Sequence, residues 1–270
     1  MLVGDAEPIL GLLIQFRGYL GGVQGVASPL ATSVHRPPGA RPVLPSPEPD
    51  REPAAWIWRI DLADDRRQEF AAETHLSESE RRRARRGTGA VRRRRILLRA
   101  GLRQALGGLL DLLPAEVPLV EDDGRPRVGG DRDLHVSCSA SGRVGVVAIV
   151  AGSEVGIDVQ TVEEDPRAAL TEGWLAPDEE SGLRRLRSTD RATAVTRCWT
   201  QKEAVLKGLG LGLRQRPATV VTPMAEAGRV GEWVIRPVPV PPGHVASVAI
   251  RTRLDEIGLV IRDMTVGEIR

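Results

Sequence analysis

Hydrophobic positions along the chain follow two periods, which together predict alternating strands and helices. Residues 56–62 (WIWRIDL) alternate as an edge strand does, whereas residues 144–150 and 155–163 are mainly apolar runs, typical of buried strands. Residues 90–110 instead repeat apolar side chains every three or four positions, which predicts a helix with one apolar stripe. Further strands, separated by Gly and Pro turns, are predicted over residues 219–222, 233–239 and 245–251.

The first 53 residues differ from the rest, and the remaining pattern divides into two halves. Apolar patches in residues 8–30 are interrupted by polar residues and glycines, which is too broken for a membrane span, and the segment then becomes rich in proline. We therefore expect a poorly ordered extension over residues 1–53. Strand, helix and strand patterns run over residues 54–152 and begin again over residues 153–270, which predicts two αβ halves.

Composition bounds the class of protein. With 270 residues, 41% of them hydrophobic, the chain is long enough to bury a sizeable core, and with 3% aromatic residues that core depends on Leu, Val and Ala. The two cysteines, Cys138 and Cys198, are too few for a disulfide framework, which favours a reduced, cytoplasmic setting. The net charge is +2, but arginines crowd residues 81–103.

This arginine-rich stretch has three interpretations. It lacks the interleaved aromatic side chains and the reading module of a nucleic-acid-binding surface, which argues against nucleic acid as a partner. It is otherwise a solvated surface or a cationic wall for a polyphosphate ligand. Ser77 and Glu80 precede it with the spacing of a capping box, so a helix is predicted to begin at that point.

The segment 197–213 (RCWTQKEAVLKGLGLGL) concentrates the candidate chemistry. On a helix, Trp199, Glu203 and Lys207 stand at i, i+4 and i+8 and share a face, and the glycines that follow end the helix. Lys202 and Lys207 are the only two lysines of the chain. A carboxylate flanked by two lysines suits a phosphate group with a hard cation, and the alternative is a solvated helix face with ordinary i,i+4 pairs.

Two further stretches, taken with this helix, carry a family resemblance. They are residues 134–142 (LHVSCSASG) and the strand 155–163 (VGIDVQTVE). The three together resemble the 4'-phosphopantetheinyl transferases of the larger, surfactin-synthetase-activating type. Residues 199–213 match the family's W-(T/S)-x-K-E-(A/S)-x-x-K-x-x-G-x-G-L helix at every fixed position, while its G-(I/V)-D-(I/V)-E strand and N-(I/L)-S-H-S turn are matched imperfectly. The resemblance covers residues 76–250.

The resemblance implies a pseudo-twofold α+β fold with the active site in the cleft between two similar αβ halves. It also implies the activity of a holo-acyl-carrier-protein synthase, which transfers the 4'-phosphopantetheinyl group from coenzyme A to a serine of an apo acyl or peptidyl carrier protein. Such an enzyme depends on Mg²⁺ and releases 3',5'-ADP. Larger members of the family tend to be monomers that serve secondary metabolism. The alternatives are a weakly active or degenerate transferase and, less favoured, an arginine-rich nucleic-acid-binding protein.

The same resemblance assigns roles at the predicted metal site. Asp158 and Glu203 are the implied ligands of Mg²⁺, Lys202 and Lys207 hold the phosphates, and Glu203, or a water that it orients, is the general base for the acceptor serine. The predicted catalytic residues are thus Asp158, Glu203 and Lys207. Gln160 stands where the family usually has a glutamate. Because an amide offers one neutral oxygen, we expect Gln160 to make a looser metal site without abolishing it.

Coenzyme A is expected to contact the N-terminal half. The resemblance places Arg83 after the predicted helix start and Arg125 in a G-K-P-like turn, where arginine replaces lysine and keeps the charge. Ser137, Cys138 and Ser139 stand where the family has Ser-His-Ser beside the 3'-phosphate. Because a thiol is a weak donor without positive charge, Cys138 is expected to weaken binding of coenzyme A unless nearby arginines compensate.

Overall fold

The structure is a computed structural model that describes residues 54–62, 66–86, 88–122, 125–130, 132–167, 169–210 and 215–267. The extension predicted over residues 1–53 lies outside the described residues. Runs of helices and runs of strands follow one another along the described chain, with short 3-10 turns at Pro114–Glu116 and Pro217–Thr219. This mixture confirms the predicted α+β class.

Two four-stranded sheets carry the fold. The first has the order β10-β1-β5-β4 and the second the order β6-β9-β8-β7. The first consists of β1 (Ala54–Asp61), β4 (Leu134–Ser141), β5 (Val144–Ala151) and β10 (Gly258–Met264), and the second of β6 (Val155–Thr161), β7 (Gly228–Val230), β8 (Trp233–Pro237) and β9 (His244–Arg251). The strand orders β1-β5-β4 and β6-β9-β8 are equivalent. In each set of three, neighbouring strands are antiparallel, and the strand that comes last in sequence lies between the other two.

The C-terminal strand returns to the first sheet. β10 pairs parallel with β1, in a register that runs from Ala54 opposite Gly258 to Ile60 opposite Met264. The first sheet is therefore built from both ends of the described chain. Consequently, part of the predicted C-terminal half, residues 153–270, lies in the sheet of the N-terminal half.

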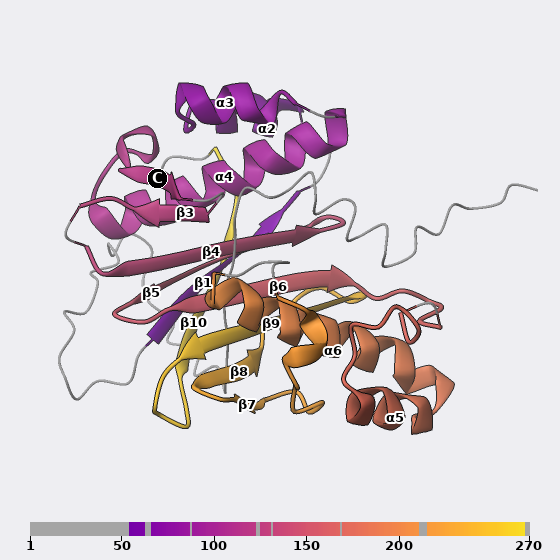
Figure 1. Ribbon diagram of the computed structural model, residues 1–270. Coiled ribbons are helices and arrows are strands. Elements are labelled where there is room, and N and C mark those ends of the chain that lie inside the picture. Colours follow the sequence, from indigo (N-terminus) through magenta and orange to yellow (C-terminus); the bar gives the residue numbers. More distant parts are fainter. Residues whose placement is uncertain are drawn as a thin grey trace, which may run out of the picture.

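The helices are α2 (Arg66–Glu73), α3 (Glu78–Ala84), α4 (Gly89–Leu110), α5 (Pro177–Arg185) and α6 (Ser188–Gly208), and a small hairpin joins β2 (Leu119–Asp122) to β3 (Arg125–Val128). α4 lies on the outer face of the first sheet and α6 on that of the second, while α2 and α3 pack on α4 and α5 packs on α6 (Figure 1). α4 confirms the helix predicted over residues 90–110. α3 begins with the predicted capping box, in which the Glu80 amide donates to Ser77 Oγ at 3.3 Å and the Ser77 amide donates to the Glu80 carboxylate at 2.8 Å.

The strand predicted over residues 219–222 is wrong. This segment ends the 3-10 turn Pro217–Thr219 and continues without strand pairing. The reason is that side chains take its backbone hydrogen bonds: the carbonyl of Val220 accepts from Lys202, and the amide of Thr222 donates to Glu179 at 2.7 Å. A run of valine and threonine resembled a strand, but tertiary contacts decide its conformation.

Strand alternation divides the interior into three apolar layers. Even-numbered residues of β1, such as Trp56 and Trp58, face α4, whereas Ala55 and Ile57 face the second sheet. Ile157 of β6 joins that middle layer, and Ala249 of β9 packs on the far side against α6. The order is therefore helix, sheet, sheet, helix. Among the described helices, none is long and apolar enough to cross a membrane.

Candidate active site

The strand β6 aims a polar row at α6. Because Ile157 and Val159 fill the middle layer, the alternate residues Gly156, Asp158 and Gln160 face the helix instead. Asp158 is completely buried and Gln160 is 3% exposed. A carboxylate placed so deeply requires partners, and these come from α6 and from β4 of the other sheet.

Gly156 lets the helix approach the strand. A Cβ atom at this position would collide with the carbonyl oxygen of Ala204 and lie 2.6 Å from the amide nitrogen of Gly208, both in the backbone of α6. Thr200 adds a hydrogen bond on the same side of the helix, with its Oγ1 2.7 Å from Ser247 Oγ of β9. The face of α6 that carries Ala204 and Gly208 is therefore held against β6, which brings Lys207 to Asp158.

Lys207 and Ser139 bind the same oxygen of Asp158. Lys207 Nζ donates to Asp158 Oδ1 at 2.6 Å, and Ser139 Oγ donates to this oxygen at 2.7 Å. The ammonium also lies 3.2 Å from Ser139 Oγ and 3.2 Å from the carbonyl of Ile157. Because Ser139 belongs to β4 and Asp158 to β6, this contact joins the two sheets at the site.

Glu203 lies on the same face of α6, but its carboxylate is not fully hydrogen-bonded. It is 4% exposed, and its Oε1 has no hydrogen-bond partner among the described residues. Burial raises the pKa of the Glu203 carboxyl to about 7; the charge of Lys207 opposes this rise, and the charge of Asp158 adds to it. Two carboxylates thus share one ammonium, so the cluster has one negative charge in excess when both are ionised.

This excess charge fits a divalent cation. Carboxylate oxygens are the ligands that Mg²⁺ prefers, and the unpartnered Glu203 Oε1 is an available one. Gln160 lies within reach of the same site, since its Nε2 donates to Asp158 Oδ2 at 3.1 Å. The described residues contain no group of three or more His, Cys, Asp or Glu side chains that could hold a metal by themselves. Asp158 and Glu203 would therefore depend on water or substrate oxygens to complete the coordination of Mg²⁺.

Comparison with known proteins identifies this region. The sequence model of the 4'-phosphopantetheinyl transferase superfamily matches residues 154–228. The match supports a transferase. It spans β6, α5 and α6, and so contains Asp158, Gln160, Glu203 and Lys207. No curated protein matches the chain.

Lys202 lies elsewhere, although it belongs to the matched segment. Its side chain is completely buried, and its ammonium is paired with the Glu179 carboxylate at 2.6 Å. It also donates to the carbonyls of Pro217, at 3.1 Å, and Val220. The structure therefore does not bring Lys202 to the Asp158 cluster, and its expected contact with phosphate stays a prediction. Glu179 is a residue to which the sequence alone gave no role in the site.

The coenzyme A residues that were predicted in the N-terminal half lie outside the matched segment and are dispersed. The side chain of Arg83 is half exposed and paired with Glu121 of β2. Arg125 of β3 donates to the main-chain carbonyl of Lys207, and so links the hairpin to the end of α6. Of the predicted serines, Ser139 reaches Asp158, while Ser137 is completely buried and its Oγ has no hydrogen-bond partner among the described residues.

Cys138 points the other way from these serines. It packs in the apolar layer against α4 and is 8% exposed. Burial raises its pKa to about 11, although the charges of Arg99 and Lys207 lower it. The thiol is therefore neutral at physiological pH. Its contacts in the structure are those of a core residue, and binding of coenzyme A at this position stays a prediction.

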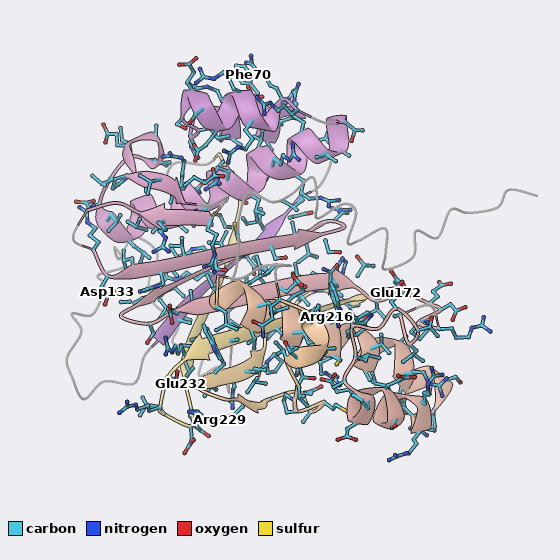
Figure 2. The ribbon with its side chains drawn as sticks, in the orientation of Figure 1. Phe70, Asp133, Glu172, Arg216, Arg229 and Glu232 are labelled. Carbon is cyan, nitrogen blue, oxygen red and sulfur yellow. The ribbon has the colours of Figure 1, made fainter. Side chains whose placement is uncertain are left out.

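The arginine-rich stretch is internally paired to a large extent. Arg92 binds Glu69 at 2.7 Å, Arg99 lies 3.5 Å from Glu80, and the buried Arg103 donates to Glu80 at 2.7 Å. These pairs tie α2, α3 and α4 together. Phe70 of α2 is 78% exposed and lies on the outer side of this helical layer, away from α6 (Figure 2).

Proposed function

We propose that the chain transfers the 4'-phosphopantetheinyl group from coenzyme A to a serine hydroxyl of an apo acyl or peptidyl carrier protein. The observation that carries this proposal is the buried cluster of Asp158, Lys207 and Glu203, which lies within the segment matched by the superfamily. The proposal extends to an enzyme of the larger, surfactin-synthetase-activating type that acts in the cytoplasm as a monomer.

The reaction is a displacement at phosphorus. The serine oxygen attacks the phosphorus that bears pantetheine, the bond to the second phosphate breaks, and 3',5'-ADP leaves. Such a transfer needs alignment and neutralisation of charge more than covalent catalysis. Glu203 is the candidate general base, because its pKa of about 7 suits transfer of the serine proton near neutral pH. Lys207 supplies positive charge beside the reacting phosphates.

Mg²⁺ would be held by Asp158 and Glu203, with Gln160 at the edge of the site. When bound, it would supply charge to neutralise the pyrophosphate of coenzyme A. The excess negative charge of the cluster and the unpartnered Glu203 Oε1 support this assignment. Ser139 and Lys207 hold the Asp158 carboxylate in one orientation, since both donate to its Oδ1.

We also infer that the two halves are related by a pseudo-twofold axis, with the active site in the cleft between them. The shared strand order supports this, as does the contact of Ser139 in one sheet with Asp158 in the other. Coenzyme A would then approach from the side of β3 and β4, where Arg125 and Ser137 lie. Arg83 and Cys138 remain part of this proposed surface, as predicted from the resemblance.

The test is mass spectrometry of an apo carrier protein incubated with the full chain, coenzyme A and Mg²⁺. We expect the carrier protein to gain the mass of one phosphopantetheinyl group on serine, and to gain nothing when Mg²⁺ is removed by a chelator. The Glu203→Gln variant should form the adduct at least about a hundred-fold more slowly. No adduct on carrier proteins of fatty-acid, polyketide and non-ribosomal peptide type would refute the proposed function.

A further inference from the structure

Lys202, the first of the two lysines in the motif, occupies a closed site of its own. Lys202 is completely buried, and its Nζ has three partners: Glu179 Oε2 at 2.6 Å, the carbonyl of Pro217 at 3.1 Å and the carbonyl of Val220. A lysine ammonium has three donors. All three are therefore used within the protein, and no donor is left for a phosphate oxygen.

The carboxylate of this pair is equally saturated. Glu179 Oε2 accepts from the Ala176 amide at 2.7 Å, and Oε1 accepts from the Thr222 amide at 2.7 Å and from Thr222 Oγ1 at 2.8 Å. Burial opposes its ionisation, but hydrogen bonds from Lys202, Thr222 and Ala176 hold the pKa of Glu179 below its ordinary value. The pair is thus ionised and neutral as a whole.

These contacts fasten two separate segments to one side of α6, the helix that carries Lys202. Glu179 lies at the start of α5, and Pro217 to Thr222 follow α6 in sequence. Replacement of the ammonium would release both segments at once, because each is held through Lys202 or through its partner carboxylate.

Helix geometry places this site away from the Asp158 cluster. Successive residues of an α-helix are about 100° apart, so Lys202 and Lys207, five positions apart, point about 140° away from each other. Lys207 faces β6, whereas Lys202 faces α5. Glu203 follows Lys202 directly, so any shift or rotation of α6 at Lys202 also moves the Glu203 carboxylate.

We propose that Lys202 is a positioning residue, which with Glu179 fixes the rotation of α6 so that Glu203 and Lys207 meet Asp158, and that it does not bind coenzyme A. This inference rests on the proposed function. Of the two lysines of the motif, Lys207 then faces the reacting groups, and Lys202 fixes the opposite side of the helix.

The first test uses the fact that Lys202 and Lys207 are the only lysines of the chain. In the protein labelled with ¹⁵N at lysine Nζ, two ammonium signals are expected. We expect Mg²⁺, and then 3',5'-ADP added with Mg²⁺, to shift the Lys207 signal and to leave the Lys202 signal unchanged. A shift of the Lys202 signal comparable with that of Lys207 would overturn the proposal.

The second test is a thermal double-mutant cycle. Lys202→Met should lower the Tm by about 10 °C, because the carboxylate of Glu179 stays buried without its partner. The double variant Lys202→Met/Glu179→Gln removes both charges and should recover at least about half of that loss. A double variant no more stable than Lys202→Met would show that the two residues do not act as a pair.

Kinetics of the double variant then separate positioning from substrate binding and from mere stabilisation. We expect kcat to fall about ten-fold or more while KM for coenzyme A stays within about two-fold, because misplaced groups slow the chemical step. A raised KM with unchanged kcat would indicate a phosphate contact, and unchanged kcat and KM a purely stabilising pair; both results would overturn the proposal. If the wild-type chain forms no adduct at all, the proposed function fails, while the lysine signals and the thermal cycle still decide where Lys202 acts.

Discussion

Two buried lysine–carboxylate clusters lie on different sides of α6, and they differ in net charge and in the number of unused hydrogen-bonding groups. Lys202 and Glu179 form a neutral pair whose donors and acceptors are all used. Lys207 pairs with Asp158, and its charge also acts on Glu203, so the second cluster has one carboxylate in excess. One oxygen of this cluster, Glu203 Oε1, has no hydrogen-bond partner among the described residues. The first arrangement holds segments together, whereas the second leaves charge that a cation or substrate can neutralise.

The comparison separates stability from function within a single helix. A buried ion pair contributes to a fold only when its geometry and its extra hydrogen bonds are complete, as they are around Glu179. A buried cluster with excess charge lowers the stability of the fold and is typical of functional sites. The matched segment contains both clusters, so a match to its motif alone does not distinguish them.

The largest effect is expected from Gly156→Ala. The added methyl group would collide with the backbone of α6 at Ala204 and force β6 away from the helix. Asp158 would then lose Lys207 and Glu203, while the Lys202–Glu179 pair lies on another side of the helix. We expect adduct formation to fall more than about a hundred-fold, since displacements of about 1 Å cost that much.

The matched control for this change is Gly108→Ala on α4. Nothing lies within 4 Å of a Cβ atom at Gly108, so this variant should keep its activity and gain up to about 1 kcal/mol in helix stability. Wild-type activity in Gly156→Ala would show that close contact between β6 and α6 is not needed.

Next in size are the two matched substitutions Glu179→Gln and Glu203→Gln, compared at pH 8 without Mg²⁺. Glu179→Gln leaves the ammonium of Lys202 buried without a carboxylate and should lower the free energy of unfolding by about 3–5 kcal/mol. Glu203→Gln removes the excess charge and should raise it by about 1–3 kcal/mol, while activity is lost. Chemical denaturation measures both values, and a change of the same sign in both variants would contradict the contrast.

The clusters should also respond to pH with opposite signs. The pKa of Glu203 is raised from 4.5 to about 7, so its contribution to stability is full below pH 4.5 and is lost as the pH rises to 7, a decline on the order of 3 kcal/mol. The pKa of Glu179 is lowered, so its contribution is present above pH 4.5 and is lost as the pH falls through the folded-state value.

Denaturation over a range of pH checks these signs in the protein without Mg²⁺. Glu203→Gln should reduce the decline in the free energy of unfolding between pH 5 and 7. Glu179→Gln should instead reduce the loss of stability at acid pH. Mg²⁺ should recover stability at pH 8 in the wild type but not in Glu203→Gln. An unchanged neutral-pH slope in Glu203→Gln would assign that decline to other groups.

Local patterns were sufficient to predict much of the cluster of Asp158, Glu203 and Lys207. The apolar run 155–163 predicted a strand, in which Asp158 and Gln160, two residues apart, share a face, and the i, i+4 spacing placed Glu203 and Lys207 on one face of a helix. These are short-range geometries that hold wherever the elements form. The mixture of strands and helices followed from the hydrophobic periods, whereas the pseudo-twofold α+β fold was implied mainly by the family resemblance.

The Lys202–Glu179 pair, the closed cluster, could not be predicted, because the partners of Lys202 come from distant segments. Glu179 meets Lys202 only after α5 folds against α6, and Pro217 and Val220 bind it from a segment that resembled a strand. Lys202 was assigned to phosphate by the family resemblance and as one of the two lysines that flank Glu203, but adjacent residues on a helix point about 100° apart. Counting that angle is a signal that could have separated the two lysines.

The smallest expected effect uses the two cysteines, because each reports on one cluster. Cys138 lies on β4 next to Ser139, with its thiol packed toward α4, and the Sγ of Cys198 lies 3.3 Å from Thr222 Oγ1 at the Glu179 site. Burial raises the pKa of Cys138 to about 11, against the charges of Arg99 and Lys207, and burial together with Glu179 raises that of Cys198 to about 12. At pH 8 both thiols are protonated, so both should alkylate far more slowly than a free thiol.

Both thiols are buried, so each reacts only when its side of α6 opens, and if the Lys202–Glu179 side is the more rigid one, Cys138 should react faster than Cys198. Iodoacetamide labelling followed by mass spectrometry measures both rates, with Cys138→Ala and Cys198→Ala assigning the peptides. Lys207→Met should slow Cys138 by removing a nearby positive charge and should leave Cys198 unchanged. Faster labelling of Cys198 than of Cys138 would mean that the Lys202–Glu179 side opens first, because reaction of a buried thiol follows local opening, and the closed cluster would then not be the more rigid of the two.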